Sequence, residues 1–289
     1  FKALKGGTGN FGIVTSFKLQ TFPVNHIYAG YINYTPDKYD TLFTLMEKYA
    51  REWVESDPKT HMIPVFVSKP STGLDMATFY NAYAEPVTTP PAAVKPFFDV
   101  PNNGSTVQVK TVKEATDELS VGFDDGFRYD MEDYSIRADA GLFKQILECW
   151  NKFTKETAQT IPGWSVGLIY QPISNSMLRA TDKKGGNILG LKPAKDPLMV
   201  VSYTFTWVRP EDDKKAYAAI KKLVTASKNI AKSQNRLADY MYLNYAGPEQ
   251  KVIESYGSAQ VDFLRKVKAK YDPDAVFEKL SPGGFKIPS

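Results

Sequence analysis

The sequence of 289 residues has few of the side chains that metal sites and many hydrolase sites require. It contains one cysteine, Cys149, and two histidines, His26 and His61. One cysteine excludes a disulfide within the chain and a metal site built from several cysteines. Two histidines make a histidine-based metal site and a Ser-His-Asp triad poor candidates. We therefore predict no metal site, a core position for the Cys149 thiol, and structural positions at strand starts for both histidines.

Long apolar runs and an excess of one charge are also missing. No run of 18 or more apolar residues is present, so the sequence predicts no membrane span. With 36 Lys and Arg against 32 Asp and Glu, the formal net charge of +4 gives no basic footprint for nucleic acid. The 43% hydrophobic and 13% aromatic content excludes disorder as the dominant state. One large folded domain or two smaller ones fit these values.

The first residues, Phe1–Gly7, contain neither a Met nor a signal peptide. A domain rarely opens on such a segment, so we expect the chain to be a fragment or one piece of a cut chain. Two Asn-X-Ser/Thr sequons, at Asn33 and Asn103, permit secretion, and we expect a secreted protein on this basis.

The periodicity of apolar residues changes several times along the chain. Alternation predicts strands at 12–20, 26–34, 62–68, 76–84, 164–171 and 198–207. Helical spacing predicts helices after Pro36 and at 139–157, 211–235 and 258–271. Several strand pairs have connections that are too short for parallel crossovers. The predicted fold class is therefore α+β, with an antiparallel sheet and helices packed on one face.

A glycine-rich segment, Gly6-Gly7-Thr8-Gly9-Asn10-Phe11-Gly12, is the first candidate for a ligand site. Four glycines in seven residues let the backbone approach a ligand and expose amide N–H groups, which can hold phosphates. The segment follows a predicted helix and precedes a predicted strand, the reverse of a Rossmann fingerprint. The residues alone favour a tight structural turn and leave a phosphate cradle as the alternative.

Two further segments carry side chains that could face a ligand. The tyrosines of 240–245 could line a flat aromatic ligand or pack a strand, and the residues alone favour packing. The 164–171 strand ends with the amide of Gln171 just before Pro172, which fits a ligand contact and an edge strand equally well. The acidic pairs Asp124-Asp125 and Glu132-Asp133 have no partner spacing and are expected to be solvated surface.

Four pieces of the chain together resemble the berberine-bridge-enzyme-like flavin oxidases, which carry an FAD domain of the vanillyl-alcohol-oxidase type. The pieces are Leu4–Thr15, Tyr170–Ile173 followed by Gly185–Leu191, Tyr242–Tyr245, and Ala269–Phe277. Their order and separation also fit the family, and they span nearly the whole chain. Thr8 stands where the family usually has a glycine.

The resemblance implies two modules. Residues 1–23 and 236–289 would belong to a PCMH-type FAD-binding domain built from both chain ends. Residues 24–235 would form a substrate domain whose antiparallel sheet covers the isoalloxazine ring of FAD. Most pyrophosphate contacts of such a domain lie upstream, so the resemblance also implies a companion chain that carries the N-terminal FAD subdomain.

The resemblance implies the chemistry of an FAD-dependent oxidase. A hydride leaves an alcohol-type carbon of a sugar or secondary metabolite, a base takes the hydroxyl proton, and oxygen is reduced to hydrogen peroxide. Tyr245 would be the catalytic base. Gln171, Tyr170 and Trp207 would contact the small-molecule substrate. The residues expected to contact FAD are Gly7, Gly9, Asn10, Phe11, Gly12 and Asn244.

Two other functions remain open from the sequence. The chain could be a non-catalytic binding or structural fragment that keeps the fold without flavin, or it could present exposed aromatic residues to a carbohydrate. The 164–171 strand contains no carboxylate, which argues against a sugar as the oxidised substrate because sugar oxidases of this family often place an acidic residue near the base.

Overall fold

An eight-stranded antiparallel sheet forms the centre of the protein in the computed structural model, which describes residues 1–121, 125–281 and 283–288. The strand order is β4-β1-β3-β2-β6-β7-β5-β8. The strands are β1 (His26–Tyr34), β2 (Thr60–Lys69), β3 (Leu74–Tyr83), β4 (Gln108–Thr111), β5 (Arg128–Arg137), β6 (Ser165–Ile173), β7 (Leu198–Trp207) and β8 (Leu237–Ala238). All their pairings are antiparallel.

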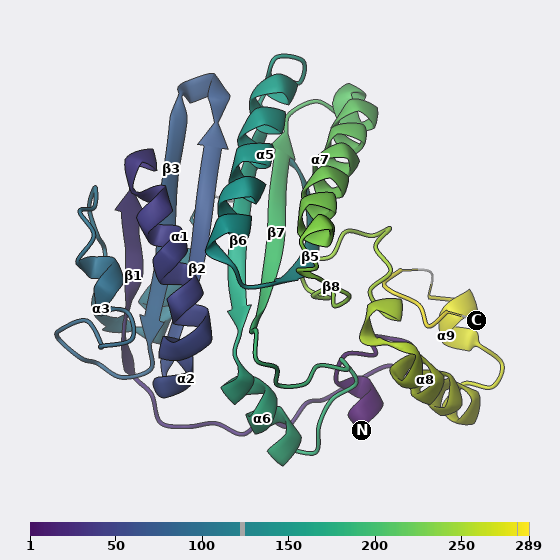
Figure 1. Ribbon diagram of the computed structural model, residues 1–289. Coiled ribbons are helices and arrows are strands. Elements are labelled where there is room, and N and C mark those ends of the chain that lie inside the picture. Colours follow the sequence, from purple (N-terminus) through teal and green to yellow (C-terminus); the bar gives the residue numbers. More distant parts are fainter. Residues whose placement is uncertain (122–124, 282, 289) are drawn as a thin grey trace.

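Helices cover one face of this sheet, as Figure 1 shows for α1 (Tyr39–Lys48), α5 (Ala140–Ala158) and α7 (Asp213–Ser233). The α+β prediction, with helices packed on one face of an antiparallel sheet, is confirmed. The other helices are α2 (Val54–Ser56), α3 (Lys95–Phe98), α4 (Val112–Leu119), α6 (Asn175–Lys183), α8 (Ser258–Tyr271) and α9 (Val276–Lys279). Among the described residues, no helix combines the length and the apolar character that crossing a membrane requires.

A large apolar core fills the space between the sheet and these helices. It is rich in aromatic side chains, and Phe66 of β2 contacts the rings of Tyr39, Phe43, Phe79 and Tyr170 at centroid distances of 5.0 to 5.9 Å. The α5 helix begins where the Asp139 carboxylate accepts a hydrogen bond from the Leu142 amide at 2.9 Å, which satisfies one of the free N–H groups of the first turn. We call residues 26–121 and 125–238 the sheet body.

The two ends of the chain lie together beside this body, at the lower right of Figure 1. We call residues 1–12, 240–281 and 283–288 the end lobe. It has a second, smaller apolar core that contains Ala3, Tyr240, Tyr256 and Leu264, and that reaches Val200 at the start of β7. The Tyr256 hydroxyl donates a hydrogen bond to the Gly6 carbonyl at 3.1 Å. Segments about 250 residues apart therefore form one unit, although the domain boundaries given above stay a prediction.

The predicted strand at 12–20 is wrong for this chain. The stretch is not part of the sheet, and Ile13, Phe17 and Leu19 are 83%, 74% and 80% exposed. Alternation identifies a sequence that can form a strand, but a strand also needs a partner for its backbone groups. No described residue supplies that partner.

The acidic pair Glu132-Asp133 also differs from the expectation of solvated surface. Both residues lie within β5, which the sequence did not predict, and Asp133 is fully buried. The carboxyl groups of Asp130, Glu132 and Asp133 break the apolar alternation by which the strand would be found. Of the other pair, Asp124 lies outside the described residues and Asp125 is exposed.

Candidate functional site

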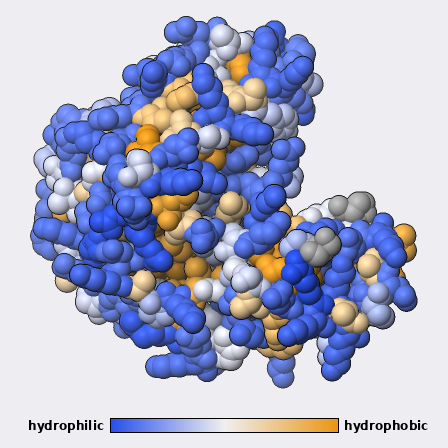
Figure 2. All heavy atoms as spheres, turned by 45° about the vertical axis from the view of Figure 1, so that its right-hand side comes forward, coloured by the Kyte–Doolittle hydropathy of each residue, from blue (hydrophilic) through white to orange (hydrophobic). Residues whose placement is uncertain are grey.

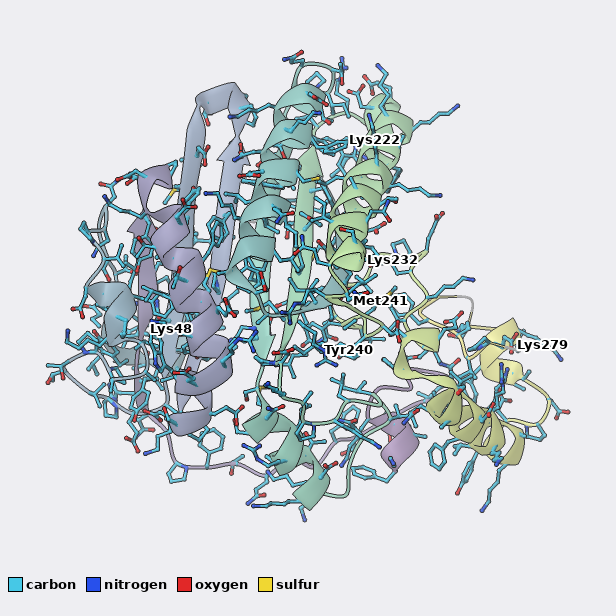
Figure 3. All side chains as sticks on the ribbon, viewed as in Figure 1. Lys48, Lys222, Lys232, Tyr240, Met241 and Lys279 are labelled. Atoms are coloured by element: carbon cyan, nitrogen blue, oxygen red, sulfur yellow. The ribbon has the colours of Figure 1, made fainter. Side chains whose placement is uncertain are left out.

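The face of the sheet that the three long helices leave open meets the end lobe along β6, β7 and β5. Because side chains alternate across a strand, Gln171 of β6 lies on this open face, opposite Val200 of β7 in the strand register. Asp133 of β5 lies on the same face, opposite Ser202. The segment 240–250 leaves the sheet body near β8 and runs over this face, and Figure 3 shows Tyr240 and Met241 between the sheet and the lobe.

The central contact of the site joins Tyr245 to Gln171. The Tyr245 hydroxyl donates a hydrogen bond to Gln171 Oε1 at 2.8 Å. Burial is the main cause that raises the pKa of Tyr245 above its ordinary value of 10, and the nearby Tyr242 adds to it. The phenol is therefore protonated at neutral pH, and it holds Gln171 through a neutral hydrogen bond.

A short turn arranges the aromatic residues of this segment. The Tyr245 amide donates to the Tyr242 carbonyl at 2.9 Å, and the two rings meet edge to face with centroids 4.8 Å apart. Asn244 is exposed and its side-chain amide donates to the Tyr242 hydroxyl at 2.9 Å. The turn thus directs Tyr245 at the sheet and leaves the Asn244 amide at the surface.

Two adjoining pockets lie beside this turn, between α6, the N-terminal turn and residues 240–244. The smaller holds about 150 Å³ and is lined by Gln171, Met177, Leu178, Leu191 and Val200 among others. The larger holds about 360 Å³ and reaches Lys5, Gly6 and Asn244. Both are lined by Thr181, Asn187, Leu189, Tyr240 and Tyr242. Figure 2 shows apolar residues in the hollow between the body and the lobe.

The glycine-rich segment reaches the larger pocket through Gly6, and its other residues line neither pocket. Asn10 is buried, and its side-chain amide donates to the Gly7 carbonyl at 2.8 Å and to the Phe285 carbonyl at 2.9 Å. A Cβ atom added to Gly7 would lie 2.3 Å from the Ala3 carbonyl oxygen, so this position requires glycine. A Cβ atom added to Gly9 or Gly12 would meet nothing within 4 Å. Gly7 and Asn10 build the turn, while Gly9 and Gly12 leave open backbone.

Two residues that the resemblance assigns to the substrate lie elsewhere. Tyr170 points to the helix-covered face, because it neighbours Gln171 and strand side chains alternate. It is fully buried, and its hydroxyl donates to the Phe143 carbonyl at 3.1 Å. Trp207 is also fully buried and lies at the far end of β7, where its indole N–H donates to Asp213 at 2.8 Å. The structure does not bring either residue to the pockets beside Gln171.

Comparison with known proteins shows which family part of this chain matches and which proteins the chain is similar to. The family described as "Berberine and berberine like" matches residues 241–279, which include the Tyr242–Tyr245 turn. The FAD-dependent monooxygenase drtC of Aspergillus calidoustus is 29% identical over 99% of this chain and 54% of its own length.

Residues 241–279 thus match this family, and the chain is similar to an FAD-dependent monooxygenase along almost its whole length. Solved structures of low identity share its fold. The 6-hydroxy-D-nicotine oxidase of Arthrobacter nicotinovorans gives a TM-score of 0.71 at 19% identity, over 95% of this chain and 58% of that chain. A variant of berberine bridge enzyme gives 0.68 at 14% identity, over 99% of this chain and 61% of that chain. The chain spans about half the length of the curated relatives it matches.

The glycine-rich turn at 6–12 departs at Thr8 from the pattern of the family that it resembles. Thr8 adopts a positive φ of 54°, a region in which glycine is favoured over a β-branched residue. Its hydroxyl donates to the Phe285 carbonyl at 3.0 Å, so the side chain gains a contact with the C-terminal segment that a glycine could not make. The departure therefore keeps the shape of the turn and ties it to the other chain end.

Sequence reasoning missed several polar residues of this site. Asn187 and Thr181 line both pockets, and Asp133 and Gln250 hold the 240–250 segment. Asp133 carried no signal in the sequence, because its acidic neighbours Asp130 and Glu132 give the stretch the pattern of a solvated surface. The described residues contain no group of three or more His, Cys, Asp or Glu side chains that could hold a metal ion.

Proposed function

We propose that the protein to which this chain belongs is an FAD-dependent oxidase of a small-molecule alcohol. The observation that supports this is the Tyr245–Gln171 pair at the junction of the sheet and the end lobe, beside pockets lined by aromatic and amide side chains. The FAD-dependent naming of the curated relatives agrees with it. When bound, FAD would accept the hydride from the alcohol carbon and pass two electrons to oxygen, which with two protons gives hydrogen peroxide.

The residues present fit a flat aromatic cofactor. In the larger pocket, Tyr240, Tyr242 and Leu189 offer apolar surface, and Asn187 and Asn244 offer amides that can donate and accept hydrogen bonds. Gly9 and Gly12 leave room for a ligand to approach the backbone. We assign FAD contacts to these groups and to Phe11, while Gly7 and Asn10 support them by shaping the turn.

Tyr245 would handle the proton of the substrate hydroxyl. Its oxygen has lone pairs that can accept a hydrogen bond from that hydroxyl while its own proton is shared with Gln171. To act as a base it must first lose this proton, and the raised pKa places that loss in the alkaline range. The rate of substrate oxidation should therefore rise with pH above neutrality.

The smaller pocket favours an apolar secondary metabolite over a sugar. Its lining is mainly aliphatic, with Ile173, Met177, Leu178, Leu191 and Val200, and it contains no charged side chain among the residues that line it. A sugar would need several hydrogen bonds to its hydroxyl groups, because polar groups that are buried without partners cost free energy. An aromatic or terpenoid-like alcohol would lose little on entering such a pocket.

The exposed segment after the glycine-rich turn supports the expected companion segment. Ile13, Phe17 and Leu19 are exposed and occupy odd positions of a stretch outside the helices and strands, so they would share one face if the stretch became a strand. An extended chain with one apolar side is suited to pairing with the edge of another sheet. We propose that this stretch pairs with the N-terminal FAD subdomain, either in the same polypeptide or in a companion chain. Ile13→Asp with Phe17→Asp should abolish that association in size-exclusion chromatography, whereas Tyr217→Asp on α7 should not.

Absorption spectroscopy and one substitution test the proposed function. The purified complete protein should show the near-ultraviolet and visible bands of flavin, and an alcohol substrate should bleach the visible band under anaerobic conditions. Tyr245→Phe should slow this bleaching by about 10²-fold or more, in the range expected for loss of a proton-transfer group. Tyr217→Phe, an exposed tyrosine on α7, is the matched control. Undiminished flavin reduction in Tyr245→Phe would remove the assignment of Tyr245.

The alternative is a flavin-free binding fragment. It predicts a complete protein without flavin bands that still binds apolar ligands or glycans. Secretion also stays a prediction. Asn103 lies on an exposed loop where a glycan would be accommodated, and mass spectrometry of protein from its native source would test it.

A further inference from the structure

Asp133 is a buried carboxylate that contacts the segment carrying Tyr245. It lies on β5 with no exposed surface. Its Oδ2 atom accepts a hydrogen bond from the Tyr242 amide at 2.7 Å. Its Oδ1 atom is buried and has no hydrogen-bond partner among the described residues. A carboxylate in such a position is costly to bury, so its presence calls for a role beyond packing.

Gln250 holds the other side of the same segment. Its side-chain oxygen accepts from the Asp133 amide at 3.0 Å and from the Gly247 amide at 2.9 Å. Its side-chain nitrogen donates to the Asp133 carbonyl at 2.6 Å. The Gln250 carboxamide therefore pairs with the backbone of β5 as a neighbouring strand would. Its oxygen also accepts the hydrogen bond from the Gly247 amide.

Together these contacts hold the segment at two points on one strand. Tyr242 is bound by the Asp133 carboxylate, and Gly247 is bound by Gln250. Tyr245 lies between the two points and reaches Gln171 on β6, two strands away in the sheet order. The chain between the anchors is short, so their position limits where the Tyr245 hydroxyl can lie.

We propose that Asp133 and Gln250 are positioning residues that fix the Tyr242–Gly247 segment on the sheet and thereby set the Tyr245 hydroxyl against Gln171. The effect on turnover rests on the proposed oxidase function, but the anchoring itself does not. Because Asp133 acts through its bond to a backbone amide, its protonation state also sets the strength of the anchor.

The surroundings of Asp133 place this change of charge near neutral pH. The pKa of Asp133 is raised to about 7, mainly by burial, while the Tyr242 amide lowers it, the neighbouring Glu132 raises it and Lys228 of α7 lowers it. The phenols of Tyr240 and Tyr256 in the end lobe also face it, and its charge raises the pKa of both.

The protonated form of Asp133 has a hydrogen-bond acceptor close by, in a hydroxyl that has no other partner among the described residues. Ser202 lies directly opposite Asp133 in the strand register, and its hydroxyl is buried without a hydrogen-bond partner among the described residues. Opposed residues on one face of an antiparallel pair have Cβ atoms within about 5.5 Å of each other. A proton on Oδ1 can therefore be donated to Ser202, while the ionised form binds the Tyr242 amide more strongly through its charge.

Hydrogen exchange tests the anchor directly in the complete protein. Asp133→Ala and Gln250→Ala should speed exchange of the Tyr242 and Gly247 amides by about tenfold relative to the wild type, the effect of one lost hydrogen bond. Asp133→Asn keeps an acceptor and should restore most of the protection of Tyr242. In the wild type, protection of Tyr242 should rise as the pH passes through about 7, and in Asp133→Asn it should not. Asp130→Asn, on the opposite face of β5, is the matched control and should leave the exchange unchanged.

The outcomes separate anchoring from catalysis. Unchanged exchange at Tyr242 in Asp133→Ala would overturn the proposal, whatever the activity. If exchange speeds up and kcat for alcohol oxidation falls with little change in KM, the positioning role is supported. If exchange speeds up and kcat is unchanged, the link to Tyr245 is overturned. A wild-type protein that oxidises no alcohol overturns the proposed function and leaves the exchange result to decide on the anchor.

Discussion

The sheet body and the end lobe differ in the interactions that stabilise the interior of each region. In the body, Phe66 and its aromatic neighbours form a continuous apolar core between the sheet and α1, α5 and α7. The lobe has a smaller core, and hydrogen bonds such as those of Asn10 with Phe285 and of Tyr256 with Gly6 connect segments that are distant in sequence. Burial of apolar area stabilises both regions, over a larger core in the body, and in the lobe hydrogen bonds also join the two ends of the chain. The Tyr245 site lies where the two regions meet, so it depends on both.

The largest effect should come from a deletion in the body. Phe66 is fully buried among four aromatic rings, and Phe66→Ala leaves a cavity that the neighbours cannot fill. We expect a loss of about 3–5 kcal/mol in the free energy of unfolding, measured by chemical denaturation. Tyr271→Ala in the lobe, where the side chain is 64% exposed, should change it by less than about 0.5 kcal/mol. Equal losses in both variants would contradict the contrast between the regions.

The next effect concerns the boundary between the regions and depends on pH. The pKa of Asp133 is raised to about 7 in the folded protein, so between about pH 4 and pH 7 the unfolded chain has lost a proton that the folded chain keeps. The contribution of Asp133 to the free energy of unfolding should therefore fall as the pH rises through this range. Above this range its contribution should stay constant. A shift of about three units corresponds to an upper bound of ~4 kcal/mol for this residue.

Denaturation curves of the wild type and Asp133→Asn, recorded at several pH values, isolate this contribution. The difference in unfolding free energy between the two proteins should change in favour of the variant as the pH rises. Glu132, whose pKa is also raised to about 7, mainly by burial, remains in both proteins, and because it is coupled to Asp133 the difference between the proteins reports on the pair. A difference that is constant from about pH 4 to pH 8 would show that Asp133 does not titrate in this range.

A smaller effect is expected from the glycine-rich turn of the lobe. An added Cβ atom at Gly7 would lie 2.3 Å from the Ala3 carbonyl oxygen and 2.7 Å from the Phe11 ring. Gly7→Ala should therefore displace the turn and lower the stability of the lobe by about 1–3 kcal/mol. At Gly9 nothing lies within 4 Å, so Gly9→Ala should leave stability unchanged or raise it by about 0.4–1 kcal/mol. Limited proteolysis of the N-terminal segment distinguishes a loosened lobe from a loosened body.

The sequence predicted elements in both regions where apolar residues recur regularly. The ranges 26–34 and 198–207 coincide with β1 and β7 of the body, and 258–271 coincides with α8 of the lobe. The β5 strand was missed because its carboxylates are buried by the lobe and by α7, which periodicity cannot show. The stretch 12–20 has the pattern of a strand but no partner among the described residues.

The candidate site contains residues that the sequence could identify and residues that only contacts between distant segments reveal. Tyr245 and Gln171 were grouped through the resemblance, and the structure brings them into contact. Alternation along β6 could have separated Tyr170 from Gln171, because adjacent strand residues face opposite sides. The anchors Asp133 and Gln250 were beyond reach of the sequence, because their roles arise from contacts across about 110 residues of chain.

The smallest effect on stability is expected at the contact proposed to matter most for activity. Tyr245→Phe removes the hydrogen bond to Gln171 at the edge of the two regions, and a neutral hydrogen bond of a half-buried group contributes about 0.5–1.5 kcal/mol. A double-mutant cycle with Gln171→Leu should give a coupling of the same size, because each single variant removes the same bond. A coupling near zero would mean that the lobe and the sheet do not share this contact in solution. A measured coupling together with strongly slowed flavin reduction would show that Tyr245 serves the chemistry far more than the fold.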